Sequence, residues 1–250
     1  MQKLKKLEKI VAVAAALAVW QAAAMLLGHD LLLVSPVKVI LRLGTIWREP
    51  GFLPAIGFTF WRIVAGFFSG FLAGTLLAVL AGRFHIVEVL LWPYMVTIKS
   101  VPVASFIIVC LIFFSSSTLS IFISFLMVLP LIYQNVLQGI KSADRQMLEM
   151  AKVFRVPWHR KLFYIDLPSL KPFLLSACSV ALGLSWKAGV AAEVIGVPDG
   201  SIGEMLYQSK IYLDTDDLFA WTVIIILASF LFEKLFLWLL RRIFAWMEGR

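Results

Sequence analysis

Residues 56–82 read IGFTFWRIVAGFFSGFLAGTLLAVLAG and contain one charged side chain, Arg62. A helix needs about 20 mostly apolar residues to cross the hydrocarbon core of a bilayer, and this stretch is long enough to do so. The whole chain of 250 residues is 61% hydrophobic and 15% charged, whereas soluble domains average about 45–50% and about 25%. The sequence therefore predicts an all-α integral membrane protein rather than a soluble domain, a disordered chain or a disulfide scaffold.

Other apolar runs predict five further spans, which makes six transmembrane helices in one domain over residues 1–250. They cover residues 10–28, 86–114, 119–140, 168–191 and 218–240. Pro93 and Pro102 interrupt the run at 86–114, which predicts a kinked or discontinuous third span. Residues 31–48 carry apolar side chains at helical spacing among basic ones, and this predicts a helix lying on the membrane surface.

The charges of the loops predict the orientation of the chain. Residues 141–171 hold seven basic and three acidic side chains, whereas residues 192–217 hold one basic and six acidic ones. Basic loops stay on the cytoplasmic side of a membrane. Both termini and the 141–171 loop are therefore expected in the cytoplasm, and retained basic residues explain the net charge of +8 without any nucleic-acid partner.

Gly66, Gly70 and Gly74 recur at intervals of four residues in the span at 56–82. Glycines on one helix face allow a neighbouring helix to approach backbone to backbone. We expect packing within the chain to explain them rather than a direct role in function.

The 141–171 loop is too long and too regular for a simple connector. Helix-forming residues run from Asp144 to Phe154, then a break at Arg155-Val156-Pro157 is followed by a second helical stretch, Trp158 to Ile165, expected to end at Leu167-Pro168. The first stretch offers apolar side chains to a partner, namely Met147, Leu148, Met150 and Phe154. Such a pair of helices suits a groove on a protein partner, and an amphipathic hairpin resting on the membrane is the alternative.

The same loop resembles the cytoplasmic signature of importer permeases of the ATP-binding cassette class, which is EAA, three residues, G, nine residues, I, one residue, LP. This chain has the same spacing, with Glu149-Met150-Ala151, then Arg155, then Ile165 and Leu167-Pro168. Met150 replaces the first alanine of the signature, and Arg155 replaces the glycine. The substitution at Arg155 puts the usual tight turn in doubt, although Pro157 can still break the helix.

Short motifs along the rest of the chain are similar to permeases of the nitrate, sulfonate and taurine type. They are Ser35-Pro36, Trp61-Arg62-Ile63, Ser100-Val101-Pro102-Val103, Ala191-Ala192-Glu193-Val194-Ile195-Gly196 and Leu213-Asp214-Thr215-Asp216. This resemblance implies a type I importer with the MetI-like fold in the bacterial inner membrane. It further implies a second permease subunit, separate ATPase subunits that carry ATP and Mg, and an extracytoplasmic solute-binding protein that delivers a small anion such as a sulfonate, nitrate or bicarbonate. No cofactor and no enzyme activity are expected on this chain, since it has no GxxxxGK[ST] phosphate-binding loop.

Charged and polar residues in the spans are candidates for the transport pathway. Lys99 lies about 20 Å along the third span and beside the break at Pro102, where it either serves an anion near the midplane or returns to the cytoplasmic surface. Arg62 can snorkel to the outer interface. Lys187 is expected to snorkel or to pair with Glu193, and Gln134-Asn135 can bridge helices or line the pathway.

Other classes of protein fit the sequence less well. No metal-ligand spacing or catalytic cluster is evident. The alternative of an ion-coupled secondary transporter or a channel subunit would call for carboxylates within the membrane, and the candidates are Glu88 and Glu233, near predicted cytoplasmic ends.

The acidic segment at 192–217 is expected to form part of the docking face for the solute-binding protein. Val197-Pro198-Asp199-Gly200-Ser201 is a turn signal, and apolar residues after it predict a short helix at the interface. A solvated loop that only obeys the orientation rule is the alternative.

Overall fold

The computed structural model describes residues 2–28 and 33–248, and every regular element within these ranges is a helix. The elements are α1 (Gln2–Leu27), α2 (Pro36–Leu43), the short 3₁₀ helix η1 (Ile46–Arg48), α3 (Phe52–Arg83), α4 (His85–Ser100), α5 (Val103–Cys110), α6 (Ser116–Lys141), α7 (Arg145–Val153), α8 (Trp158–Lys161), the π-helical turn η2 (Leu162–Asp166), α9 (Leu167–Gly196), α10 (Ile202–Ile211) and α11 (Thr215–Glu248). The prediction of an all-α fold is confirmed.

Five stretches of helix among the described residues are long and apolar enough to cross a membrane. They are Ile10–Leu27, Phe52–Arg83, Ser116–Lys141, Trp158–Gly196 and Thr215–Met247. Helices α4 and α5 pass the same test together, with a bend of 102° between them, so the pair can supply a sixth span. Pro102 follows the bend and disfavours helical backbone at Val101. The predicted discontinuity is therefore present at Pro102, whereas Pro93 lies within α4 and does not end it.

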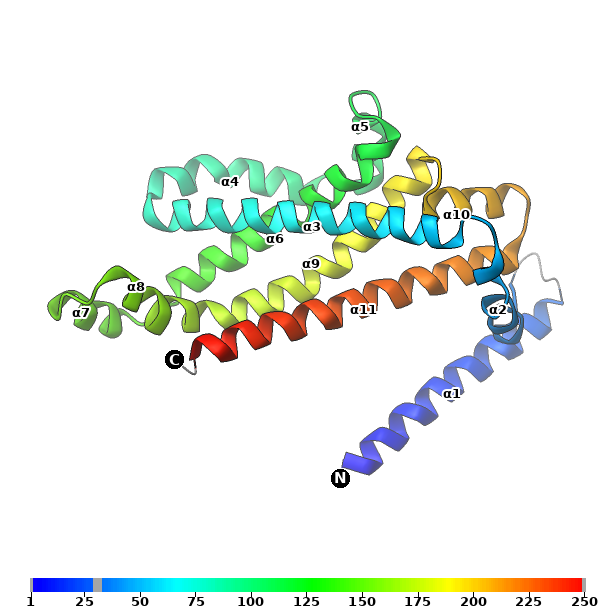
Figure 1. The fold of residues 1–250 in the computed structure, drawn as a ribbon, viewed down its shortest axis with the longest axis horizontal. Coiled ribbons are helices and arrows are strands. Elements are labelled where there is room, and N and C mark those ends of the chain that lie inside the picture. Colours follow the sequence, from blue (N-terminus) through cyan, green and yellow to red (C-terminus); the bar gives the residue numbers. More distant parts are fainter. Residues whose placement is uncertain (1, 29–32, 249–250) are drawn as a thin grey trace.

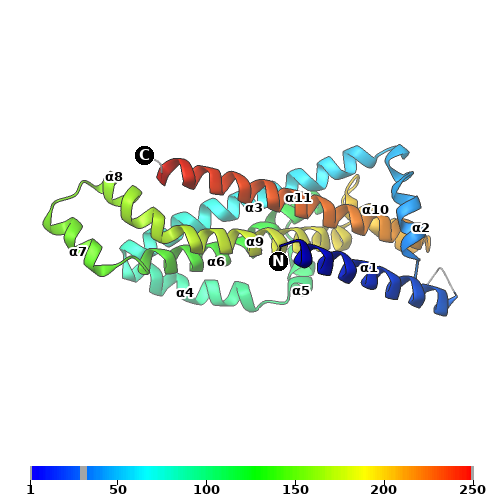
Figure 2. The ribbon, with the colours of Figure 1, turned by 90° about the horizontal axis from the view of Figure 1, so that it is seen from below.

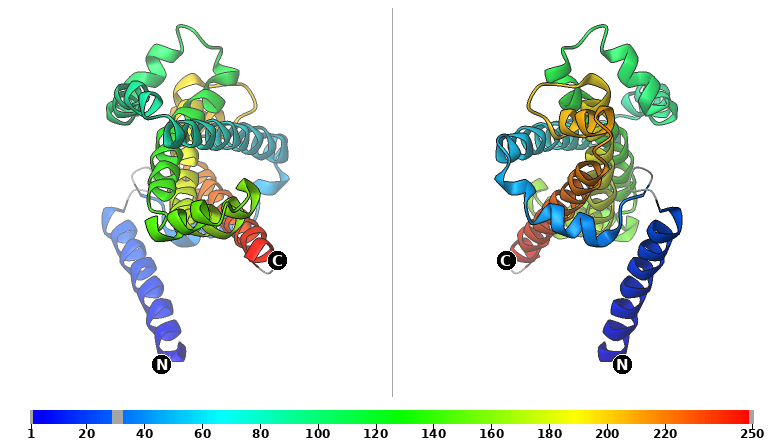
Figure 3. Two further views of the ribbon diagram at one scale, coloured as in Figure 1. Left: turned by 90° about the vertical axis from the view of Figure 1, so that its left-hand side faces the viewer. Right: turned by 90° about the vertical axis from the view of Figure 1, so that its right-hand side faces the viewer.

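Helices α3, α6, α9 and α11 run side by side along the long axis of the molecule (Figure 1). Helix α6 packs against α3 on one side and α9 on the other, and α11 packs against α9. The loop helices α7 and α8 lie at one end of these four helices, and α2 and α10 lie at the other (Figures 1 and 2). Helix α1 stands away from the body, which the views along the long axis show most clearly (Figure 3).

The contact between α3 and α6 depends on the glycines spaced four residues apart. A Cβ atom at Gly66 would lie 2.5 Å from the Ile121 carbonyl oxygen, and one at Gly70 would lie 2.8 Å from that of Phe125. At Gly74 the corresponding distance to the Leu129 oxygen is 2.8 Å. These distances are too short for real side chains, so the three glycines let the two backbones touch.

Aromatic side chains fill the core between α3, α9 and α11. The fully buried Phe67 ring of α3 meets Phe232 and Phe236 of α11 edge to face, with centroids 6.1 Å and 5.1 Å apart. Trp186 of α9 is buried in the same cluster. Edge-to-face geometry is a favourable arrangement for such rings, and it joins the two outer helices of the body.

Three observed helices have ends that differ from those predicted. Helix α9 continues past residue 191 to Gly196, because the carboxylate of Glu193 is buried and bonded rather than exposed in a loop. Helix α11 extends beyond 218–240 at both ends. The predicted surface helix at 31–48 is shorter, since it consists of α2 and η1, and residues 31 and 32 lie outside the described residues.

Candidate functional site

The first helix of the 141–171 loop, α7, is capped at both ends by its own sequence. At its start, Gln146 N–H donates to Asp144 Oδ1 over 2.8 Å. At its end, Val156 N–H donates to the Ala151 carbonyl over 2.9 Å and Arg155 N–H donates to that of Lys152 over 3.2 Å. These two bonds form a Schellman turn, in which the residue after the cap adopts left-handed backbone.

Arg155 is the residue that adopts this left-handed conformation, with φ of 49°. It occupies the position at which the importer signature has glycine. Glycine reaches positive φ without a steric cost, whereas a residue with a Cβ is strained there by about 1 kcal/mol. The tight turn that the substitution puts in doubt is therefore present, and the structure explains the residue type of the signature.

Two signature residues hold the loop closed. Ala151 of α7 and Ile165 of η2 are both buried, and they pack together with Ala143 in a small cluster of their own. Leu148 is half-buried and packs against this cluster, so it does not face outward as predicted. The cluster holds the two arms of the loop together, because it contains Ala151 from α7 and Ile165 from η2.

The outward face of α7 and the turn after it is apolar and exposed. The side chains of Met147, Met150, Val153, Phe154 and Trp158 are between 50% and 77% exposed. We call these five residues the coupling surface. Glu149 lies beside them and is also exposed, so a charge stands at the edge of an apolar patch. A patch of this kind on a loop marks a site where a protein or a membrane binds.

The second arm of the loop does not end at Leu167-Pro168 as predicted. Helix α8 passes through the π turn η2 into α9 without a break, and Pro168 occupies the first turn of α9. Proline lacks an N–H, and a π turn before it accommodates the missing backbone bond. Leu167 packs against the main core, so the loop is joined to a long apolar helix without an intervening flexible segment.

Lys99 and Gln134 are brought together beside the break in the third span. Lys99 is exposed at the end of α4, and its Nζ donates to Gln134 Oε1 of α6 over 2.6 Å. Asn135 has a local partner instead, because its Nδ2 donates to the Leu131 carbonyl over 2.8 Å. Of the predicted pathway residues, Lys99 and Gln134 therefore form one polar site, and Asn135 bonds to its own helix.

Thr59 and Glu193 form a second polar group, away from the loop helices. Glu193 of α9 is completely buried, and its Oε2 accepts a hydrogen bond of 2.7 Å from Thr59 of α3. The Arg62 guanidinium lies 3.5 Å from the centre of the Phe58 ring, and no ion pair joins it to Glu193 among the described residues. Lys187 is exposed on α9 and pairs with no carboxylate in the described ranges, so the predicted pairing with Glu193 is wrong.

Residues 70–248 match the family model for the binding-protein-dependent transport system inner membrane component. The chain belongs to this family. It is 24% identical to the putative aliphatic sulfonates transport permease of Bacillus subtilis, across 93% of this chain and 85% of that protein. It is 28% identical to the taurine transport system permease of Escherichia coli, across 91% and 84%, and 27% identical to the nitrate import permease of Synechococcus elongatus, across 77% and 72%.

The chain is thus a permease subunit of a binding-protein-dependent ABC importer and a multi-pass membrane protein, as the resemblance implies. Family members of this kind are transport subunits and not enzymes. The alternative of an ion-coupled transporter or a channel is set aside. The two carboxylates that were its candidates are in structural contacts, since Glu88 pairs with Lys141 over 2.5 Å and Glu233 accepts from Ser179 over 2.6 Å.

Three of the six acidic residues in the 192–217 segment of the permease are committed to local structure. Glu193 is buried, Asp217 pairs with Arg42 of α2, and Glu204 closes the turn before α10 by accepting from Gly200 N–H over 2.5 Å. The hydrogen bond to Asp217 raises the pKa of Arg42 above its ordinary value, and a hydrogen bond to Glu49 adds a smaller effect in the same direction. Of the other three, Asp199 and Asp214 are exposed and Asp216 is half-buried.

Sequence reasoning missed the role of Thr59. Its hydroxyl donates to Glu193 and also accepts from Ile202 N–H over 3.0 Å, so one side chain joins α3, α9 and the start of α10. The predicted short helix at the outer end is present as α10, and Thr59 fixes its position. A buried hydroxyl between two apolar stretches gave no signal in the sequence, because its partners are distant in the chain.

Proposed function

We propose that the coupling surface binds the ATPase subunit of the importer. Its exposed apolar side chains suit a groove in a partner protein, and its supporting cluster and continuous connection to α9 suit the transmission of force. The residues assigned to coupling are Glu149, Met150, Ala151, Arg155, Ile165, Leu167 and Pro168. These residues have different roles. Met150 and Glu149 contact the partner, whereas Ala151 and Ile165 pack the loop against itself. Arg155 forms the turn after α7, and Leu167 and Pro168 connect the loop to α9.

This assignment implies an orientation. ATPase subunits with bound ATP and Mg lie in the cytoplasm, so the end of the body that carries α7 and α8 is cytoplasmic, as are both termini. The six spans then include the bent pair α4–α5, which counts as one broken span. The basic 141–171 loop supports this orientation, because positive charge is retained inside.

Charge reversal on the coupling surface tests the proposal. Glu149→Lys leaves the fold intact because Glu149 is exposed, and Met150→Asp places a charge on the apolar face. Met150→Asp is expected to weaken association with the ATPase subunit by about tenfold or more, as a loss at the centre of an interface does. Glu149→Lys, at the edge of the patch, is expected to weaken it less. The measurement is the amount of ATPase subunit that copurifies with the permease in detergent, together with ATP-driven uptake in vesicles.

Asp199→Lys is the matched control, because it reverses an exposed charge just before α10, and α10 lies at the end of the molecule opposite α7 (Figure 1). It is expected to leave assembly with the ATPase subunit unchanged. Normal assembly and normal uptake by both Glu149→Lys and Met150→Asp would show that the ATPase binds elsewhere.

We further propose that the cargo is a small anion. The proteins similar to this chain are permeases for aliphatic sulfonates, taurine, nitrate and bicarbonate by name. The exposed pair Lys99 and Gln134 offers a cation and an amide donor at a break in the third span, and interrupted backbone beside a charge is a common setting for a substrate site. Arg62, Lys187, Asn135 and Glu193 lie on other faces or in structural contacts, so Lys99 and Gln134 are the proposed pathway residues.

Lys99→Gln tests the pathway, with Lys187→Gln as the matched loss of an exposed lysine. The first variant is expected to slow uptake of a sulfonate or of nitrate in proteoliposomes while ATPase assembly is retained. Equal uptake by the two variants would remove Lys99 from the pathway.

One chain supplies half of a closed pathway, and we propose that a second identical subunit supplies the other half. Helix α1 packs little against its own chain, and it presents apolar side chains outward along its length, among them Ile10, Val13 and Leu17. Two-fold pairing is the commonest arrangement of identical subunits. The mass of the solubilised complex checks it, since one permease chain per complex excludes the pairing.

A further inference from the structure

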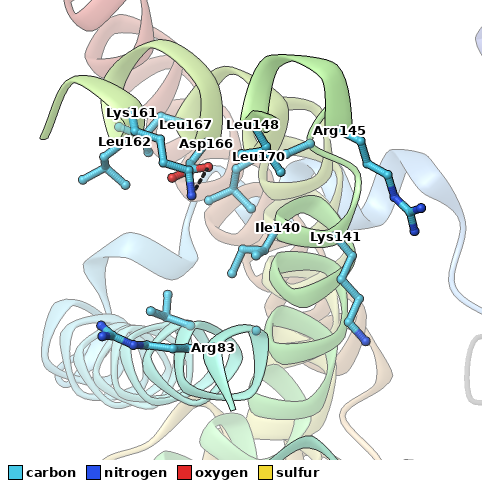
Figure 4. A pocket seen from close by; sticks show the side chains of 13 residues that line it. Arg83, Ile140, Lys141, Arg145, Leu148, Lys161, Leu162, Asp166, Leu167 and Leu170 are labelled. Atoms are coloured by element: carbon cyan, nitrogen blue, oxygen red, sulfur yellow. Dashed lines mark ion pairs between the residues drawn. The ribbon is translucent and has the colours of Figure 1, made fainter. Parts of the chain in front are cut away.

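A cavity of about 680 Å³ lies beneath the coupling loop, between the ends of α3 and α6 and the start of α9 (Figure 4). Its wall is mainly aliphatic, with Val79 from α3, Ile140 from α6 and Leu148 from α7. Leu162, Leu167 and Leu170 complete it from the second arm of the loop and from α9. The space therefore adjoins three spans and can receive a hydrocarbon chain.

The rim of this cavity is strongly basic. Arg83, Lys141, Arg145 and Lys161 line it together with a single carboxylate, Asp166. Figure 4 shows Arg83 and Lys161 on one side of the space and Lys141 and Arg145 on the other. Four cations around an aliphatic wall are typical of a site for an amphiphile with an anionic head.

Two of the four cations lack a carboxylate partner in the part of the chain that the structure describes. Lys141 pairs with Glu88 over 2.5 Å, and Lys161 lies 3.8 Å from Asp166. The Arg83 guanidinium lies 5.8 Å from the centre of the Phe84 ring, and Arg145 is exposed at the start of α7. In Figure 4 both side chains extend outward from the rim, on opposite sides of the space. Their charges are available to a ligand, and a guanidinium can bind a phosphate group through two parallel hydrogen bonds.

The cavity lies on a different face of the loop from the coupling surface. Leu148 of α7 points toward it, whereas Met147 and Met150 on the same helix are exposed. A ligand in the cavity and a protein on the coupling surface can therefore bind at the same time. A ligand there touches α3, α6, α7 and α9, so it supports the loop from the side of the spans.

We propose that this cavity binds an acidic phospholipid, with its anionic headgroup at the basic rim and its acyl chains against the aliphatic wall. Basic pockets between spans at the cytoplasmic face are suited to anionic headgroups. The proposal rests on the orientation given above, which places the cavity at the level of the inner leaflet. It adds a lipid requirement to the coupling loop that neither the signature nor the family implies.

The test measures lipid binding on the purified full-length permease without any ATPase, so its result does not depend on the proposed coupling. Short-chain dioctanoyl phosphatidylglycerol is titrated in detergent and bound lipid is counted by native mass spectrometry. Loss of two cations near an anionic lipid is expected to weaken binding about 30-fold. Arg83→Gln with Arg145→Gln should show this loss, whereas Arg83→Lys with Arg145→Lys should stay within about threefold of the natural chain.

The matched control is Arg241→Gln with Arg242→Gln, which removes two exposed cations from the same end of the molecule but away from the cavity. Equal losses in the two glutamine pairs would show a general surface attraction and overturn the site. Two further titrations separate the sources of binding. Phosphatidylcholine of the same chain length that binds equally well would overturn headgroup recognition, and inorganic phosphate that binds equally well would reduce the cavity to a site for free anions.

Discussion

Gly70→Ala is expected to separate α3 from α6. The added Cβ would lie 2.8 Å from the Phe125 carbonyl oxygen and 2.9 Å from the Val128 Cβ, whereas ordinary van der Waals contact begins at 3.4 Å. The closest of these atoms belongs to the backbone, so no side-chain rotation relieves the overlap and the helices must move apart by about half an ångström. Overpacking of this size destabilises a protein by about 1–3 kcal/mol.

The assay is thermal unfolding of the detergent-purified permease, followed by the loss of its monodisperse peak in size-exclusion chromatography. For a chain of this size a change of about 2 kcal/mol corresponds to about 4–8 °C. Gly57→Ala on the same helix is the matched control, because nothing lies within 4 Å of the added atom. It is expected to be neutral or to stabilise by up to about 1 kcal/mol. An unchanged midpoint for Gly70→Ala, or equal losses in both variants, would refute the close contact between α3 and α6.

Three further outcomes follow from the structure. Arg155→Gly is expected to stabilise the loop by up to about 1 kcal/mol by relieving positive φ, seen as slower proteolysis of the 141–171 loop, whereas Arg155→Ala, which keeps a Cβ, should give no such gain. Thr59→Val is expected to destabilise the permease by about 2 kcal/mol, because it leaves Glu193 and Ile202 N–H without a partner, and Thr59→Ser should recover most of the melting temperature. Asp199→Asn, Asp214→Asn and Asp216→Asn together should slow stimulation of the importer ATPase by the solute-binding protein, most at low salt, and stimulation that is unchanged at low and high salt would exclude this segment as an electrostatic docking face.

The spans could be predicted from sequence because each is a long apolar run, and the break in the third followed from Pro102. The coupling loop was predictable for a different reason, since its spacing matched a known signature. The Schellman turn at Arg155 was not predictable from local chemistry, because the residue that favours this turn is glycine and arginine rarely adopts positive φ. The buried cluster of Ala151 and Ile165 holds the turn in place, and that cluster exists only in the folded loop.

Glu193 shows where a reading along the chain fails. A carboxylate after an apolar run indicates the end of a span, and its neighbours Asp199 and Glu204 favoured an acidic outer loop. The structure places this carboxylate inside the protein, because Thr59, 134 positions earlier, donates to it. A buried carboxyl group is tolerated more readily when the fold supplies a hydrogen-bond partner. The same Thr59 hydroxyl accepts a hydrogen bond from Ile202 N–H, so it fixes α10 to α3 and α9. Any movement of these spans during transport must therefore carry α10 with it or break that buried contact.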